Sequence, residues 1–455
     1  MKYRKERDAM GSVRVPVDAY YGSQTQRAAD NFPISGLTFP SVFIHALALV
    51  KKYAAQVNNG LDLLNPELAD AISQAAQEII DGGFSDQFVV DVFQTGSGTS
   101  TNMNMNEVIA SRANEILTGK KGGKSPAHPN DHVNLGQSSN DVIPSAIHIS
   151  AFILMHQRLI PSLKSLKKAL TAKSHEFKDI PKLGRTHLQD AVPIFLGQEF
   201  SGYARQIELG IERIQTAQPR MAELALGGTA VGNGLNTHPD FARQVIALIS
   251  KHTGLPFTEA QNHFEAQAAQ DGAVETSGAL KTLAVSLVKI SNDIRWLASG
   301  PRCGLGEINL PPLQPGSSIM PAKVNPVIPE AVIQVAAQVM GNDTTIMLGG
   351  QAGNFELNVM LPVIAYNLLQ SITLIATVTE VFAEKCIVGI TANRQTCEAY
   401  IEKSLALVTG LVPKLGYDKA AAIAQNAYET GKSIREVVIE GKILPEDELT
   451  DLLKV

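Results

Sequence analysis

The chain has 455 residues, of which 44% are hydrophobic and 18% are charged, and its formal net charge is −5. This is the composition of an ordinary soluble globular protein, and the weak net charge argues against nucleic acid as a main partner. Three cysteines, Cys303, Cys386 and Cys397, form no CxxC pair. Their spacing argues against a zinc ribbon or a cysteine-ligated iron–sulfur cluster and favours a reduced, cytoplasmic compartment.

The N-terminal segment MKYRKERDAMGSVRVP is charged and lacks the apolar centre of a secretory signal peptide. No later segment gives about 18 uninterrupted apolar residues, the length that a membrane-spanning helix needs. We therefore expect an untargeted, soluble chain.

Helical spacing of hydrophobic residues dominates the chain, and no alternation of strands with helices appears. Long helices are predicted over about residues 140–172, 190–217, 327–348 and 355–386. A fifth, GALKTLAVSLVKISNDIRWLASG, has a heptad seam whose apolar residues are Leu280, Leu283, Leu287, Ile290, Ile294 and Leu297. Flanking Ala284, Val285 and Val288 widen its apolar surface, so we expect a helix covered on several sides. The predicted fold class is all-α.

Shorter helical patterns broken by loops flank this central run. We predict an N-terminal domain of mixed, mainly short-helix structure at 1–137, a central helical bundle at 138–393 and a small helical domain at 394–455. The heptad seam fits a helix buried in a monomeric bundle and a helix shared between subunits equally well, because periodicity alone does not separate them.

The first polar, glycine-rich interruption is QTGSGTSTNMNMNEVIASRANEIL. Gly96 and Gly98 free the backbone, and Ser97 and Thr99 offer hydroxyl donors where a helix is predicted to begin. The positive end of that helix would favour an anion. A flexible turn with an ordinary hydroxyl cap is the alternative.

A second interruption, HPNDHVNLGQSSNDVIPSAIHI, places Ser138, Ser139 and Asn140 at the predicted start of another long helix. These side chains repeat the arrangement of hydroxyl and amide groups at a positive helix end. We therefore expect the two segments to serve one anion.

Two nearby segments look like cofactor-binding motifs, but each lacks a feature that its motif requires. His128 and His132 have the spacing of helical metal ligands, but Pro129 is expected to break the helix that would align them. The segment GKKGGKS resembles a phosphate-binding loop, yet Thr118 stands where its first glycine belongs and no strand precedes it. Neither a metal nor a nucleotide is predicted.

The third segment, KLGRTHLQDAVP, places Thr186 and His187 beside an approaching helix. Histidine is a natural proton carrier near neutral pH, so His187 is a catalytic candidate. A surface or structural role is the alternative, since the chain has 10 histidines.

The fourth segment, QPGSSIMPAKVNPVIPEAVIQ, predicts a loop at Gly316 that gathers Ser317, Lys323 and Asn325, after which Glu330 opens a helix. A lysine and an asparagine suit a carboxylate ligand. A serine beside a cation can act as a base, because the cation favours the deprotonated hydroxyl. A polar interhelical loop without chemistry is the alternative.

Taken in order, these segments resemble the fumarase/aspartase superfamily. GSSIMPAKVNP resembles its signature loop, and the segments that resemble class II fumarases are TGSGT, HPND, QSSND, GRTHLQD, ALGGTAVG, ASGPRCGLGE and GNFELNV. Aspartases share the loop but typically read QSTND, GAGTS and GQLxLNV, so Ser139, Ser97 and Asn354–Phe355 favour the fumarases. An aspartate ammonia-lyase and a noncatalytic relative, such as the lens proteins of the superfamily, are the alternatives.

The resemblance implies reversible hydration of fumarate to L-malate in the tricarboxylic acid cycle, without a metal or organic cofactor. It implies a homotetramer whose central five-helix domains form a twenty-helix core, with each active site built from three subunits. The implied reaction is trans addition or elimination of water through an aci-carboxylate carbanion.

Residue roles also follow from the resemblance. Ser317 would take the C3 proton of malate, and His187, polarised by Glu330, would handle the water. The implied substrate-binding residues are Ser97, Thr99, Ser138, Ser139, Asn140, Thr186, Lys323 and Asn325.

A secondary dicarboxylate site at His128, Asn130 and Asp131 is implied as well. Similar fumarases often have an arginine three residues before the histidine, where this chain has Ser125 next to Lys124. That departure weakens the expectation of the secondary site.

Overall fold

The structure is a computed structural model and describes residues 2–453. Within that range it has 17 α-helices, α1 to α17, and ten short strands that pair only two by two. The predicted all-α class is confirmed. The described residues form two compact units, made of residues 2–161, 210–284 and 337–376 and of residues 162–209, 285–336 and 377–453.

The first unit contains seven whole helices, which are α1 (Ser23–Asn31), α2 (Ser41–Gly60), α3 (Pro66–Ile80), α4 (Thr99–Thr118), α5 (Ser139–Leu154), α8 (Phe241–Thr253) and α9 (His263–Ala268). Four long helices contribute residues to both units, namely α7 (Leu196–Ala222), α10 (Asp271–Leu297), α11 (Val327–Gly350) and α12 (Leu361–Lys385).

Helix α6 (Ile160–Glu176) leads into the second unit, whose other helices are α13 (Arg394–Lys403), α14 (Val412–Leu415), α15 (Tyr417–Thr430), α16 (Ile434–Glu440) and α17 (Glu446–Leu452). Two π-helical turns are η2 (Pro129–Val133) and η3 (Met155–Leu159), and three 3₁₀ turns are η1 (Ser85–Gln87), η4 (Ile387–Gly389) and η5 (Leu405–Leu411).

The strands pair as β1 (Tyr3–Asp8) with β2 (Gly11–Pro16), β3 (Pro181–Thr186) with β4 (Gln189–Phe195), β5 (Glu223–Leu224) with β6 (Thr258–Glu259), β7 (Ile308–Asn309) with β10 (Thr391–Ala392), and β8 (Gly353–Asn354) with β9 (Leu357–Asn358). The two long hairpins, β1–β2 and β3–β4, were not predicted from the sequence. Each is an isolated pair without a sheet, so it leaves no strand-rich stretch in the sequence.

The predicted long helices are present, with shifted boundaries. The helix predicted near 140–172 is a continuous run through α5, η3 and α6. The helix predicted from about residue 190 begins only at Leu196, because strand β4 occupies the preceding residues. Similarly, α12 begins at Leu361 because the hairpin β8–β9 precedes it.

The heptad seam of α10 is buried, with each of its six residues at most 5% exposed. Val285 on the same helix is 54% exposed. The expectation that flanking apolar residues would also be covered is therefore wrong for Val285 within a single chain.

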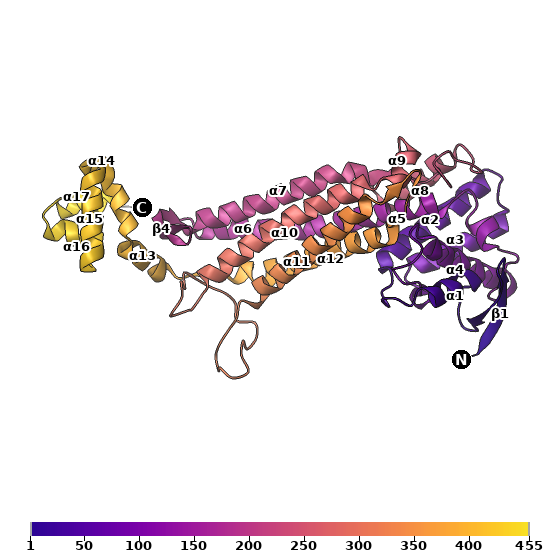
Figure 1. The fold of residues 1–455 in the computed structure, drawn as a ribbon, viewed down its shortest axis with the longest axis horizontal. Helices are drawn as coiled ribbons and strands as arrows, with labels where there is room; N and C mark the ends of the chain where they lie inside the picture. Colours follow the sequence, from indigo (N-terminus) through magenta and orange to yellow (C-terminus); the bar gives the residue numbers. More distant parts are fainter. Residues whose placement is uncertain (1, 454–455) are drawn as a thin grey trace. The chain divides into compact units, whose positions relative to one another are not determined.

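In the first unit, the portions of α10, α11 and α12 run side by side (Figure 1). Ser277 and Lys281 of α10 both donate to Asp343 of α11, the Ser277 bond being 2.7 Å long. Asn342 of α11 donates to Ser371 of α12 over 3.0 Å. These polar contacts between the helices help to fix their register.

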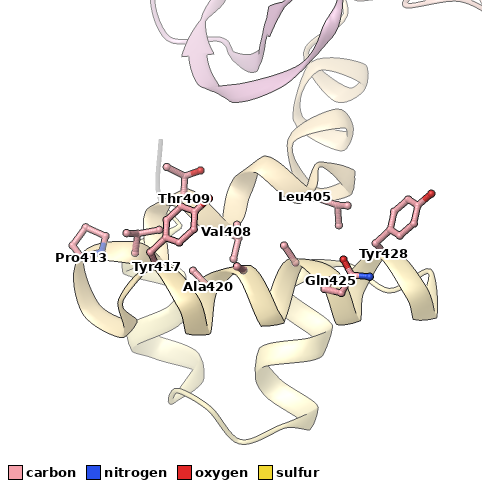
Figure 2. A pocket seen from close by; sticks show the side chains of 11 residues that line it. Leu405, Val408, Thr409, Pro413, Tyr417, Ala420, Gln425 and Tyr428 are labelled. Carbon is pink, nitrogen blue, oxygen red and sulfur yellow. The ribbon is translucent and has the colours of Figure 1, made fainter.

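Helices α14 to α17 form a small cluster, drawn in yellow in Figure 1, with a core of its own. The fully buried residues of this core include Ile434, Val438 and Leu449, together with Leu411 of the preceding turn η5. Outside this core, η5, α14 and α15 border an apolar groove of about 750 Å³. Figure 2 shows Tyr417 and Tyr428 at its two ends.

Leu361–Gly389 is long and apolar enough, by length and composition, to cross a membrane. However, 61% of its most apolar window is buried inside the structure. A buried core helix of a soluble protein passes the same test of length and hydropathy.

Candidate active site

The segment TGSGT ends in a tight turn that only glycine fits. Gly98 precedes α4 with φ of 72°, a left-handed conformation that glycine adopts without strain. At Gly96, a Cβ atom would lie 1.9 Å from the carbonyl oxygen of Val359. The two glycines therefore place Ser97 and Thr99 at the N-terminus of α4, as the sequence predicted.

A chain of hydroxyl groups joins the first two predicted segments. The Oγ of Ser97 lies 2.7 Å from Oγ1 of Thr99, which lies 2.6 Å from Oγ of Ser139. The N-termini of α4 and α5 thus meet through their side chains. Because unsatisfied amides and the positive dipole end lie at each helix start, this meeting point favours an anion.

The N-terminus of α5 is held by a capping box. Oγ of Ser138 accepts from the backbone N–H of Asn140 over 3.2 Å, and Asp141 accepts from the N–H of Ser138 over 2.9 Å. Asn140 donates its side-chain amide to the carbonyl oxygen of Ala230 over 2.8 Å. The helix start is therefore fixed before any ligand binds.

Asp141 connects this helix start to the GGTA loop, a role that sequence analysis missed. Its Oδ2 accepts from the N–H groups of Gly227 and Thr229, both over 3.0 Å. Burial raises the pKa of Asp141, while its backbone donors and the charge of Lys51 act in the opposite direction. The clue in the sequence was its place in the capping pattern Ser-x-x-Asp.

His128 is the extended N-cap of the π-helical turn η2, which starts at Pro129, so His128 and His132 do not share a helix, as expected. Proline suits this first position because its missing N–H would be unpaired there. Nδ1 of His128 accepts from the N–H groups of Asn130 and Asp131 over 3.2 and 3.1 Å. Burial lowers the pKa of His128. In residues 2–453, no group of three or more His, Cys, Asp or Glu side chains is arranged to hold a metal.

Thr186 and His187 lie on the β3–β4 hairpin, not beside an approaching helix as predicted. Thr186 pairs with Gln189, so His187 and Leu188 form a two-residue turn. Their φ values are 55° and 61°, which match the type I′ turn that joins tightly twisted strands. Positive φ values are uncommon for residues other than glycine. The His187 side chain is exposed at the tip of the hairpin.

Buried charges anchor the base of this hairpin. Arg185 makes two hydrogen bonds to the carboxylate of Glu307, over 2.8 and 3.1 Å, and Glu307 is fully buried. Lys182, also buried, donates to Glu199 over 2.9 Å and lies 3.6 Å from Glu307. The two contacts to Glu307 were not predictable, because Glu307 is more than a hundred residues away from Lys182 and Arg185 in sequence.

The signature loop closes on itself through Gly316. Its N–H donates to the carbonyl oxygen of Lys323 over 2.7 Å, and its carbonyl oxygen accepts from the Asn325 amide over 2.8 Å. Oγ of Ser317 accepts from the N–H groups of Ile319 and Met320 over 3.2 and 3.1 Å. Two such donors stabilise negative charge on an oxygen. The loop predicted from sequence is therefore folded around Ser317.

The structure groups the candidate residues unequally. Ser97, Thr99, Ser138, Ser139 and Asn140 belong to the first unit and are joined by hydrogen bonds. The remaining candidates belong to the second unit and are Thr186, His187, Ser317, Lys323, Asn325 and Glu330. Across the described residues of this one chain, no side-chain hydrogen bond or ion pair joins His187 to Glu330 or to Ser317.

Known proteins resemble this chain over nearly its whole length. Residues 11–341 match the lyase family, and residues 407–455 match the family described as the fumarase C C-terminus. The class II fumarate hydratase of Nitrosomonas europaea is 56% identical over 438 residues, covering 96% of this chain and 95% of that protein. That of Mycobacterium tuberculosis is 57% identical over 439 residues, covering 96% and 91%.

Solved structures give the same result. The class II fumarase of Schistosoma mansoni superposes with a TM-score of 0.97 at 41% identity, covering 100% of this chain and 98% of that one. A cobalt-bound fumarate lyase:delta crystallin of Brucella melitensis superposes with a TM-score of 0.95 at 45% identity, covering 99% and 98%. With sequence relatives more than half identical and a shared fold over the whole chain, this protein belongs to the class II fumarate hydratase family.

Proposed function

We propose that the protein is a fumarate hydratase, which adds water reversibly to fumarate and forms L-malate. The observation that carries the proposal is the hydroxyl chain from Ser97 through Thr99 to Ser139, which joins two helix N-termini. Fumarate and malate are dianions, and a site of this kind supplies several neutral donors and two positive dipole ends to one carboxylate. Asn140, Thr186, Lys323 and Asn325 would complete the binding of the second carboxylate.

Ser317 is the proposed base. In the direction of malate dehydration, its alkoxide oxygen takes the proton from C3, and the electron pair of that C–H bond moves into the neighbouring carboxylate as an aci-carboxylate. The two N–H groups that Ser317 accepts favour its negative oxygen before the step. Lys323 and Asn325 would stabilise the charge that develops on the substrate.

His187 is the proposed acid. It would give a proton to the C2 hydroxyl group, which leaves as water when the carbon–carbon double bond forms, and Glu330 would polarise the imidazole. In the hydration direction the same imidazole takes a proton from the attacking water. Neither step draws on a metal or an organic cofactor.

The proposed assembly is a homotetramer with a twenty-helix core and active sites shared by three subunits. Support comes from the exposed hairpin tip of His187, which forms no side-chain hydrogen bond or ion pair with Ser317 or Glu330 within residues 2–453 of one chain. Exposed apolar side chains on the long helices also support it, since Val285, Met347 and Leu348 are 54%, 51% and 49% exposed. Surfaces of this kind are typical of subunit interfaces.

Three further expectations stay proposals. We infer domains at 1–137, 138–393 and 394–455, and the separate core of α14 to α17 supports the last of these. We infer a cytoplasmic location, which suits three cysteines that are all free. The secondary site at His128, Asn130 and Asp131 is a weaker proposal, because both backbone N–H groups already bond to His128.

One assay tests the proposed reaction and its alternatives. The purified protein, pretreated with EDTA, is given fumarate, L-malate and L-aspartate in turn, and the ultraviolet absorbance of the fumarate double bond is followed. We expect interconversion of fumarate and malate without added metal or nucleotide. Faster release of ammonia from aspartate would select the aspartase alternative, and no turnover of any substrate would select a noncatalytic role.

A further inference from the structure

A lysine side chain lies buried behind the proposed substrate site. Lys51, on α2, is 0% exposed. Its Nζ donates to Oδ1 of Asn134 over 3.0 Å and to Oε1 of Gln137 over 2.9 Å. Both acceptors lie in the short segment that leads directly into Ser138 and the start of α5.

Asn134 connects this lysine to α4 as well. Its Oδ1 also accepts from the side-chain amides of Asn102 and Asn106, over 3.2 and 3.1 Å. Its own amide donates to the carbonyl oxygen of Gln137 over 3.1 Å. Lys51 therefore stands at the junction between the two helices whose N-termini carry Thr99 and Ser139.

The charge of Lys51 is poorly compensated. Within the described residues, no carboxylate lies in ion-pair contact with its Nζ. The carboxylate whose charge acts on it is that of Asp141, which three backbone N–H groups also share. The other polar groups around Nζ are neutral amides. Burial lowers the pKa of Lys51 to about 7.

A side chain that only held Asn134 and Gln137 in place would not need a positive charge. Burying an ammonium group away from an ion partner costs far more than burying a neutral amide of similar reach. Buried charges without an ion partner are commonly found where the charge serves a functional site. A dianion bound at the N-termini of α4 and α5 would supply the missing negative charge.

We propose that Lys51 is a positioning residue whose buried ammonium group fixes the N-termini of α4 and α5 and favours the binding of dicarboxylate dianions. This inference rests on the proposed function, because it concerns the same site. It assigns no contact between Lys51 and substrate, since the lysine acts through Asn134, Gln137 and its charge.

A pH dependence of binding follows. The charged form of Lys51 favours the dianion, so bound substrate must in turn favour the charged form. As pH rises through about 7, the free protein loses the proton from Lys51. Substrate affinity should therefore fall above neutrality, and binding near pH 7 should take up protons.

The first test compares Lys51→Met with Lys52→Met, a matched control one residue along α2 whose lysine bonds to Gln77 over 2.6 Å. At pH 6, Lys51→Met should raise KM for malate by about 5- to 50-fold, with a smaller change in kcat. It should also lose the rise of KM with pH that the wild type and Lys52→Met show. An unchanged KM and pH profile in a folded Lys51→Met tetramer would overturn the proposal.

A second test does not depend on that variant folding. Proton uptake is measured by calorimetry when succinate, which cannot react, binds to the His187→Asn protein near pH 7 in buffers of different ionisation enthalpy. We expect net uptake that disappears at pH 5.5. Binding without proton uptake would contradict the role of Lys51, since His187 is absent from this background.

Thr99→Val separates this inference from the proposed function. A rise in KM for Thr99→Val with no effect of Lys51→Met would remove only the role of Lys51. Normal KM values in both variants would show instead that the dicarboxylate does not bind at these helix starts.

Discussion

The two halves of the candidate site are held in different ways. In the first unit, Ser97 and Ser139 are each 8% exposed and bond to Thr99 between them. In the second unit, His187 is exposed on a hairpin tip, and Lys323 is exposed on a loop. The candidate residues of the first unit are joined by hydrogen bonds, whereas within residues 2–453 no side-chain hydrogen bond joins His187 to Ser317 or Glu330.

The difference follows from what each half does. Donors that bind an anion work best when they are fixed in advance, because no reorganisation is then needed on binding. Acid–base groups at exposed positions can reach a site only when another surface meets them. The backbone supports this reading, since the strained turn at His187 is held by the buried pair of Arg185 and Glu307.

The largest effect should come from the exposed half. Ser317→Ala removes the proposed base but leaves the loop closed through Gly316, Lys323 and Asn325. We expect kcat for malate to fall about 10²- to 10⁴-fold, with KM changed much less. Ser318→Ala is the matched control and should keep activity. Steady-state kinetics in which Ser317→Ala retained near wild-type kcat would remove Ser317 as the base.

His187→Asn should have the next largest effect. Asparagine tolerates positive φ, so the hairpin turn should persist. We expect kcat to fall by about 10²-fold and its pH dependence near neutrality to flatten, because imidazoles titrate there. His175→Asn, at an exposed position on α6, is the control. A full pH profile in His187→Asn that matched the wild type would exclude His187 as the acid.

A third prediction concerns the stability of the first unit, whose candidate residues Ser97, Thr99 and Ser139 are already joined by hydrogen bonds and form what we call the prebuilt half. The pKa of Lys51 is about 7 in the folded protein against 10.5 in the unfolded chain, so the unfolded chain binds more protons between these values. Folded stability should therefore rise with pH across that window. Relative to Lys51→Met, wild-type stability should increase by about 2 kcal/mol from pH 7 to pH 9.

Denaturant unfolding at fixed protein concentration measures this change, because assembly makes the midpoint depend on concentration. Lys52→Met should follow the wild type at both pH values. Parallel curves for wild type and Lys51→Met would mean that Lys51 keeps its charge up to high pH.

The smallest effect is expected from one hydroxyl of the prebuilt half. Thr99→Val keeps the side-chain shape but removes the hydroxyl between Ser97 and Ser139. We expect KM for malate to rise about tenfold and kcat to change less, since neighbouring donors remain. Thr118→Val at the other end of α4 is the control. A kcat loss without any rise in KM would assign Thr99 to the chemical step.

The helix starts that carry Thr99 and Ser139 were predictable from the sequence. The glycines before Thr99 and the hydroxyl and amide residues at Ser138 to Asn140 are local signals of a helix start, and such signals act over only a few residues. The link from Thr99 to Ser139 was expected only because both segments offered the same chemistry. The long helices were found for a similar reason, since their apolar spacing is continuous.

The features that were not predicted are contacts between residues far apart in the sequence. Nothing near Glu307 indicates that it pairs with Arg185, and nothing near Lys51 indicates that it bonds to Asn134. The hairpin of His187 was taken for the approach to a helix because strand β4 has no neighbours beyond β3. The exposed tip and the helix surface at Val285 became visible only in three dimensions.

Mixed assemblies of two inactive variants test the central claim most directly, namely that the exposed half is completed by other copies of the chain. Ser317→Ala and His187→Asn proteins are unfolded together, refolded at equal ratio and checked for hybrids by native mass spectrometry. If Ser317 and His187 of one site come from different subunits, roughly a quarter of the sites should regain both groups. Confirmed hybrid tetramers without any recovered activity would contradict the account, because a site built within one chain always keeps one of the two defects.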